Sequence, residues 1–199
     1  MSASEELERA AELHVLCAGY LGRPDNRVGA TVTFIRDGDI LVVHDPGLVA
    51  TPGTILDPLA DLGVAPGDVT DVVFSHHHPD HTLNAALFPD ARFHDHWAIY
   101  EHDLWTSRVA EGFVVSPSIR LIEAPGHTPQ DITMLVGTPD GLVALTHLWW
   151  TATSPEEDPY ATDPDALHAN RRRVLALDGL TQVIPGHGEP FVPSAETPR

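Results

Sequence analysis

The segment 75–82 constrains this chain more than any other feature, because within it four side chains of metal-ligand type fall in six residues: His76, His78, Asp80 and His81. The segment continues directly from residues 71–75, which have the composition of a short buried strand. The four side chains are therefore expected at the C-terminal end of a strand, where the sites of α/β proteins collect. His76 and His78 share one side of an extended chain, and Pro79 then makes the chain turn. Chance enrichment of a surface loop in histidine does not account for this order, so the segment predicts a metal site.

Two further histidines occur in matching contexts far downstream. His127 lies in the stretch Ala-Pro-Gly-His-Thr-Pro, and His187 lies in Ile-Pro-Gly-His-Gly-Glu. Each follows a short apolar strand and a Pro-Gly turn, where the glycine lets the backbone bend sharply and the histidine projects from the strand's end. Either one alone would be more typical of a capping or surface histidine. Together with the segment 75–82, they predict that distant strand ends meet at one metal site.

The rest of the pattern alternates strands and helices. Strands are expected over residues 14–20, 30–36, 40–44, 71–75, 91–94, 119–123, 132–136, 142–146 and 183–184. Helices are expected over residues 5–12, 55–62, 97–109 and 165–178, the last preceded by Asp163 as N-cap and Pro164 at the first helical position. The predicted strands form two groups along the sequence, and each group is followed by helices. This order predicts two sheets packed face to face with helices outside.

The whole chain sets broader limits. Its 199 residues fit one domain over residues 1–199. No apolar run approaches the roughly 18 residues of a membrane helix, and the acidic N-terminus lacks the apolar core of a signal peptide. We therefore expect a cytoplasmic protein with no membrane partner, and the oligomeric state stays open. The formal charge of −18 repels phosphate backbones, which disfavours a nucleic-acid partner, and a small-molecule substrate is expected. The basic run 171–173 is expected on a solvated helix face.

These motifs resemble those of the metallo-β-lactamase superfamily. The segment 75–82 matches its His-x-His-x-Asp-His motif, and residues 126–128 match its Gly-His-Thr element. Residues 185–188 match its late Pro-Gly-His-Gly, and residues 45–47 match an early strand that ends in Asp-x-Gly. The resemblance runs from about residue 30 to residue 190. It implies an α/β fold, the αββα sandwich of two mixed β-sheets flanked by helices, with the metals at one edge.

The resemblance also implies how the ligands are shared between two metals. One ion would be held by His76, His78 and His127. A second would be held by Asp80, His81 and His187. We take Asp80 as the candidate catalytic side chain as well. Asp45 is expected to orient a ligand histidine.

The pattern departs from the family at His147. Many family hydrolases place an aspartate about twenty residues after the third histidine, where it bridges both metals. This chain has Leu-Thr-His147-Leu-Trp at that place. A neutral imidazole has one free lone pair and cannot bridge as a carboxylate does. His147 is therefore a candidate terminal ligand of the second metal, the mark of a site that keeps one metal, or a group that orients other ligands.

The ligand types predict the chemistry. Three neutral imidazoles leave a metal with most of its charge and an open position, and a water bound there has its pKa lowered to near 7. The expected metal is zinc, as one or two ions, with manganese or iron as alternatives. The expected function is a metal-dependent hydrolase that uses metal-bound hydroxide on a small ester, thioester or lactone. The segment 149–162 is expected to form a loop on the substrate side, with Trp149 and Trp150 as candidate pocket residues.

Three other functions are compatible with the same motifs. One is a phosphodiesterase or ribonuclease of the same fold, which the acidic charge disfavours. Another is a mono-iron thiol or persulfide oxygenase, a branch that also relies on an aspartate at the position of His147. The last is a metal-binding protein without catalysis. Turnover of ester and phosphodiester substrates, rather than metal binding, would distinguish among them.

Overall fold

The fold is a sandwich of two β-sheets that face each other, with helices outside. A computed structural model describes residues 7–22, 25–153 and 155–199. The first sheet has seven strands in sequential order, namely β1 (Glu12–Cys17), β2 (Val32–Asp37), β3 (Ile40–His44), β4 (Asp71–Val73), β5 (Arg92–His94), β6 (Ala98–Glu101) and β7 (Leu104–Ser107). The second has five strands, in the order β12 (Leu180–Pro185), β11 (Gly141–Thr146), β10 (Ile132–Thr138), β9 (Ile119–Glu123) and β8 (Val114–Ser116).

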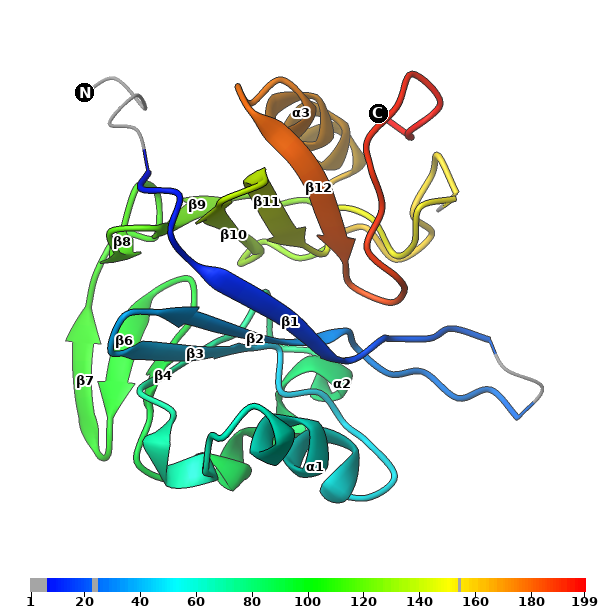
Figure 1. Cartoon of the computed structure of the whole chain (residues 1–199). Coiled ribbons are helices and arrows are strands. Elements are labelled where there is room, and N and C mark those ends of the chain that lie inside the picture. Colours follow the sequence, from blue (N-terminus) through cyan, green and yellow to red (C-terminus); the bar gives the residue numbers. More distant parts are fainter. Residues whose placement is uncertain (1–6, 23–24, 154) are drawn as a thin grey trace.

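The helices cover the outer faces of the two sheets, as Figure 1 shows. The helix α1 (Gly53–Asp61) packs on the seven-stranded sheet through Ile55 and Leu59. The helix α3 (Pro164–Leu175) packs on the five-stranded sheet through Leu167 and Val174. The short helix α2 (Pro79–Thr82) lies at the end of the sandwich, and two 3-10 turns span Pro66–Asp68 and Leu83–Leu87. The predicted αββα arrangement is therefore confirmed.

Alternating apolar side chains hold these layers together. Ile35 and Val42 point between the sheets, where they share a buried cluster with Met134 of the other sheet. Their neighbours Phe34 and Val43 point the opposite way and join the cluster under α1. Because successive side chains of a strand point to opposite faces, a strand covered on both faces needs a continuous apolar run.

Several strands lead to one edge of the sandwich. β3 pairs with β4 in parallel, and β11 pairs with β12 in parallel, so each pair delivers two C-terminal ends to the same edge. The backbone N–H of Ile132 donates to the carbonyl of Ser75 at 2.9 Å, which joins the two sheets there. This edge receives all the predicted ligand segments.

Two predicted helices are wrong. Residues 97–109 form the hairpin of β6 and β7, which turns at His102 and Asp103 with His102 in the left-handed region at φ 54°. The hairpin forms because β6 pairs with β5, a tertiary contact that outweighs a helical spacing of apolar residues. Residues 7–11 are also not helical, since the N–H of Ala11 donates to the carbonyl of Gly137, and residues 5–6 lie outside the described residues. The strand β8 was not predicted.

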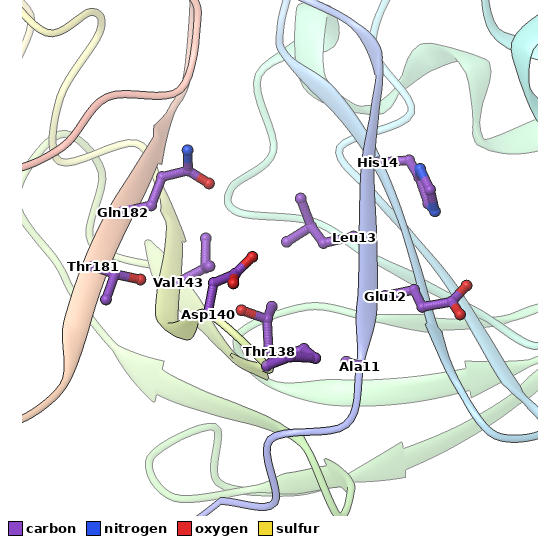
Figure 2. Close-up of a pocket in the computed structure, with 10 residues that line it drawn as sticks. Ala11, Glu12, Leu13, His14, Thr138, Asp140, Val143, Thr181 and Gln182 are labelled. Atoms are coloured by element: carbon purple, nitrogen blue, oxygen red, sulfur yellow. The ribbon is translucent and has the colours of Figure 1, made fainter.

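A cavity of about 460 Å³ opens between the edge strands of the two sheets. Figure 2 shows Leu13 of β1 pointing toward Val143 of β11 across this gap, while Glu12 and His14 point away from it. Among the described residues that line the cavity there is no candidate ligand, so it is separate from the predicted metal site. Within the described ranges, no helix has the length and apolar character required to cross a membrane.

Candidate metal centre

Three of the predicted ligands form one group where β4 and β9 end. His76 and His78 follow β4, and His127 follows β9 after a sharp turn. One ligand nitrogen from each lies within 4.8 Å of the other two. The turn requires Gly126, because a Cβ at that position would lie 2.6 Å from the Cα of Leu167 in α3. The three imidazoles are thus arranged as a tripod.

Three other predicted ligands form a neighbouring group. Asp80 and His81 project from α2, and His187 follows β12. The Oδ2 atom of Asp80 lies 3.6 Å from Nε2 of His81 and 3.7 Å from Nε2 of His187. All three ligand atoms lie within 4.8 Å of one another. The structure therefore brings together both trios that the family resemblance implies.

Asp45 anchors the first segment from behind. Its Oδ1 accepts a hydrogen bond from the N–H of Ser75 at 2.7 Å, and its Oδ2 accepts from the Ser75 hydroxyl at 2.7 Å. The same Oδ2 lies 2.7 Å from Nδ1 of His81, and the Ser75 Oγ lies 3.0 Å from Nδ1 of His76. Since a carboxylate can only accept, His81 donates from Nδ1 and turns Nε2 toward the site. Asp45 thus has the orienting position that was expected from the sequence.

Electrostatics keep the Asp45 carboxylate ionised. Burial raises its pKa, but the nearby His44 and His81 and the hydrogen bonds from His81 and Ser75 outweigh burial and lower the pKa to about 2. Burial likewise opposes protonation of His81, yet the Asp45 carboxylate raises the His81 pKa above its ordinary value. A metal ion at Nε2 of His81 would displace the second proton from this imidazole, because a ligating histidine is neutral.

His127 and His187 are each oriented by a hydrogen-bond partner that is far away in the sequence. Nδ1 of His127 donates to Oδ2 of Asp158 at 2.8 Å, and Nδ1 of His187 donates to the carbonyl of Gly29 at 3.0 Å. Sequence reasoning missed Asp158, which lies 31 residues beyond His127. The one available signal was the number of acids in the segment 149–162. Each partner fixes the tautomer that leaves Nε2 free for a metal.

The donor set fits a metal ion. The Nε2 atoms of His76 and His81 are buried and have no hydrogen-bond partner among the described residues. Nε2 of His127 lies 3.2 Å from Nδ1 of His78, so two imidazole nitrogens face each other where a cation would satisfy both. Burial lowers the pKa of His76 well below its ordinary value, which keeps that imidazole neutral. Neutral imidazole nitrogens with one carboxylate oxygen form a donor set suited to zinc.

Comparison with known proteins agrees with this geometry. The family model of the metallo-beta-lactamase superfamily matches residues 25–189. The chain belongs to the metallo-beta-lactamase superfamily. Metallo-beta-lactamase domain-containing protein 1 of Xenopus laevis is 33% identical over 199 residues, which cover 90% of this chain and 80% of the frog protein. The chain spans less than two thirds of the rat, mouse and human proteins of the same name.

Solved structures of the superfamily share the fold at lower identity. A metallo-beta-lactamase-like protein of Thermotoga maritima has a TM-score of 0.74 at 20% identity, over 93% of this chain and all of that one. A dizinc quorum-quenching lactonase, solved with its homoserine product, has a TM-score of 0.61 at 19% identity, over 79% of this chain and 72% of that one. At such identities the likeness extends to the fold alone.

His147 lies between the two ligand groups. It follows β11 and is buried, and its ring centroid lies 4.2 Å from that of His127 and 5.1 Å from that of His187. A ligand nitrogen of His147 also lies within 4.8 Å of those of His76 and His81. Its Nε2 is 3.1 Å from Nε2 of His187, and its buried Nδ1 has no hydrogen-bond partner among the described residues. The residue that departs from the family pattern is thus within reach of both groups.

Two other histidines near the site, His77 and His94, face carboxylates outside the ligand groups. Nε2 of His77 lies 3.2 Å from the carboxylate of Asp95, away from its neighbours His76 and His78. Nε2 of His94 lies 2.7 Å from Oδ1 of Asp71 inside the sheet. Both imidazoles thus have carboxylate partners that belong to neither ligand group.

Two smaller expectations are wrong. Trp149 does not line a pocket: it is fully buried, and its indole N–H donates to the carbonyl of Pro198 at 2.8 Å. Arg171 does not lie on a solvated face, since it is also fully buried. Its neighbour Arg173 is exposed and pairs with Glu111, as expected for a surface residue. A run of three arginines spreads around a helix, so one of them must turn toward the core side.

We expect the Asp45 carboxylate to stabilise the metal-free protein by about 2 kcal/mol near neutral pH. Its pKa is lower in the folded chain, about 2, than the ordinary value of 3.8. The stabilisation is therefore complete above pH 4 and is lost as pH falls through 2. Asp45→Asn preserves the shape, and asparagine tolerates the left-handed backbone at φ 47°. Urea unfolding of metal-free protein should show a difference in the free energy of unfolding at pH 7 that shrinks toward pH 2.

The control for this prediction is Asp39→Asn, in the exposed turn between β2 and β3. It should change the free energy of unfolding little at either pH. An Asp45→Asn protein as stable as the wild type at pH 7 would contradict the assignment.

Proposed function

We propose that this protein is a zinc-dependent hydrolase that acts on a small ester, thioester or lactone. The observation that carries the proposal is the convergence of two ligand groups in which His81, His127 and His187 are oriented through Nδ1. Such oriented imidazoles are typical of metal centres. Membership of a superfamily with lactonase and beta-lactamase structures supports hydrolysis over other metal chemistry.

The residues of the chain have distinct parts in the proposed reaction. His76, His78 and His127 would hold the zinc ion, and Asp45 and Asp158 would keep His81 and His127 in the required tautomers. When bound, zinc supplies Lewis acidity and a water whose pKa is lowered to about 7. Asp80 lies at the open side of the site with its side chain 17% exposed. Its carboxylate would accept a hydrogen bond from the attacking water and orient it toward the substrate carbonyl.

Charge supports a neutral substrate. The chain contains no lysine, and all eleven basic residues are arginines. In the part of the chain that the structure describes, no arginine forms a hydrogen bond or ion pair with a candidate ligand, and the buried Arg171 donates from Nε and Nη1 to backbone carbonyls. A substrate carboxylate or phosphate would therefore meet the metal without a second cation to bind it. This arrangement favours an ester, thioester or lactone over a phosphodiester.

We expect the zinc-loaded protein to hydrolyse a carboxylic ester, with kcat/KM rising with pH through an apparent pKa near 7. A suitable panel is 4-nitrophenyl acetate, a phenyl thioester, γ-butyrolactone and bis(4-nitrophenyl) phosphate. Removal of zinc by a chelator should abolish turnover, and added zinc should restore it. Preferred cleavage of the phosphodiester would favour the phosphodiesterase alternative. A requirement for molecular oxygen would favour the oxygenase, and zinc binding without turnover of any substrate would favour a non-catalytic metal protein.

A further inference from the structure

An aromatic pair stands beside the candidate metal centre. The rings of Trp150 and Tyr160 are stacked, with centroids 5.7 Å apart and planes 17° from parallel. Trp150 is partly buried, whereas Tyr160 is 72% exposed. The Trp150 ring meets His127 edge-on, with centroids 6.4 Å apart. An aromatic surface open to solvent therefore begins at a ligand of the tripod.

Asp158 forms hydrogen bonds with both Trp150 and Tyr160 and with the candidate metal ligand His127. Its Oδ2 accepts from Nδ1 of His127 at 2.8 Å and from the indole N–H of Trp150 at 3.0 Å. Its Oδ1 accepts from the backbone N–H of Tyr160 at 2.8 Å. The carbonyl of Trp150 accepts from the N–H of His187 at 2.7 Å, so this residue is also tied to the second ligand group. A single buried carboxylate thus sets the position of both aromatic residues relative to the metal centre.

Arg171 of the helix α3 stabilises the segment that contains Trp150 by hydrogen bonds to its backbone. Its Nε donates to the carbonyl of Leu148 at 2.7 Å, and its Nη1 donates to the carbonyl of Glu156 at 2.8 Å. The two carbonyls lie on either side of Trp150, so one buried guanidinium from α3 fixes the loop before and after it. An exposed tyrosine on a loop fixed in this way is preorganised for a ligand, which lowers the entropy lost on binding.

We infer that Trp150 and Tyr160 bind a planar, uncharged aromatic group of the substrate beside the metal centre. The inference rests on the proposed hydrolase function and adds to it the substrate class, an aryl ester or aryl thioester. Aromatic rings pack favourably on one another, and the outer surface of Tyr160 is free to receive one. Glu156 and Glu157 are exposed on the same loop, so an anionic aromatic group would be repelled.

The test compares two acetate esters on the zinc-loaded full chain. 2-Naphthyl acetate offers an aromatic group, and ethyl acetate offers none. Tyr160→Ala should raise KM for 2-naphthyl acetate about three- to tenfold more than KM for ethyl acetate. Tyr160→Phe should restore the wild-type ratio, because it retains the ring. The control Trp105→Ala removes an aromatic residue of comparable exposure from β7 and should leave the ratio unchanged. Equal effects of Tyr160→Ala on both esters would overturn the inference.

A binding measurement separates this inference from the proposed function. The neutral alcohol 2-naphthol should bind the wild type and quench its tryptophan fluorescence, with a Kd about three- to tenfold lower than for Tyr160→Ala. If neither ester is hydrolysed but 2-naphthol binds as expected, the hydrolase proposal fails and the aromatic site stands. If the esters are hydrolysed and Tyr160→Ala changes neither KM nor the Kd of 2-naphthol, the aromatic site fails alone.

Discussion

His76→Ala is expected to abolish tight zinc binding at the tripod and to lower kcat/KM for ester hydrolysis by at least about 10³-fold, or about 4 kcal/mol of transition-state stabilisation. The reason is the central place of this imidazole. It belongs to the group with His78 and His127 and also to the group with His81 and His147. Among the described residues, its buried Nε2 has no hydrogen-bond partner that could take the place of a metal ion. Titration of metal-free protein with zinc, followed by calorimetry, and steady-state kinetics would measure both losses.

The matched control is the adjacent His77→Ala. Its ring is 39% exposed and faces Asp95 rather than the metal centre. This variant should keep its zinc stoichiometry and lose less than about threefold in kcat/KM. Retention of tight zinc binding by His76→Ala, or equal losses in the two variants, would show that the tripod is not the primary metal site.

His147→Asp is expected to tighten the second zinc ion about 10- to 100-fold, and His147→Ala is expected to weaken it by a similar factor. In the wild type we expect the second ion to bind more weakly than the first. An aspartate can give one oxygen to each ion, whereas an imidazole can give one nitrogen to a single ion. The position suits either ligand, because His147 lies within ring-contact distance of both groups. Calorimetric titration of the three metal-free proteins with zinc would compare the two binding steps.

A second pair of variants tests the place of the His147 ring without removing it. A Cβ at Gly186 would lie 2.3 Å from Cδ2 of His147, so Gly186→Ala should displace the imidazole and weaken the second ion. A Cβ at Gly188 would make only ordinary contacts, the shortest 3.4 Å to Thr151, so Gly188→Ala serves as the control. Two zinc ions bound with equal, tight affinity by the wild type, and no gain in His147→Asp, would show that the missing carboxylate has no effect on metal binding.

The loop over residues 149–162 shows what local sequence patterns predict and what they do not. Its prolines and acids predict irregular structure, and in the described part of the range, without residue 154, the structure has no helix or strand. Its first residue nevertheless belongs to the core, since Trp149 is buried against Phe191. Removing the middle of the loop would also remove Asp158 from His127. Substrate preference and metal affinity should therefore change together in such a deletion.

Periodicity and short motifs are local properties of the sequence. The elements and ligand motifs that depend on them alone could therefore be predicted from the sequence. The strand β9 and the N-cap of α3 at Asp163 follow from residues close together in sequence. The ligand segment also lies within a few residues, and Pro-Gly turns mark the two distant histidines. Their grouping could be expected because parallel strands carry their C-terminal ends to the same edge of a sheet.

Only the tertiary structure decided which residues far apart in sequence meet. It placed Asp158 against His127, and it turned Arg171 inward to the backbone of Leu148 and Glu156. It also made residues 97–109 a hairpin, because β6 pairs with β5 and extends the seven-stranded sheet. Such choices depend on the free energy of contacts between distant segments, and no local pattern records that free energy. The family pattern made His147 a candidate ligand, but only the structure placed it between the two ligand groups, beside rings from three separate parts of the chain.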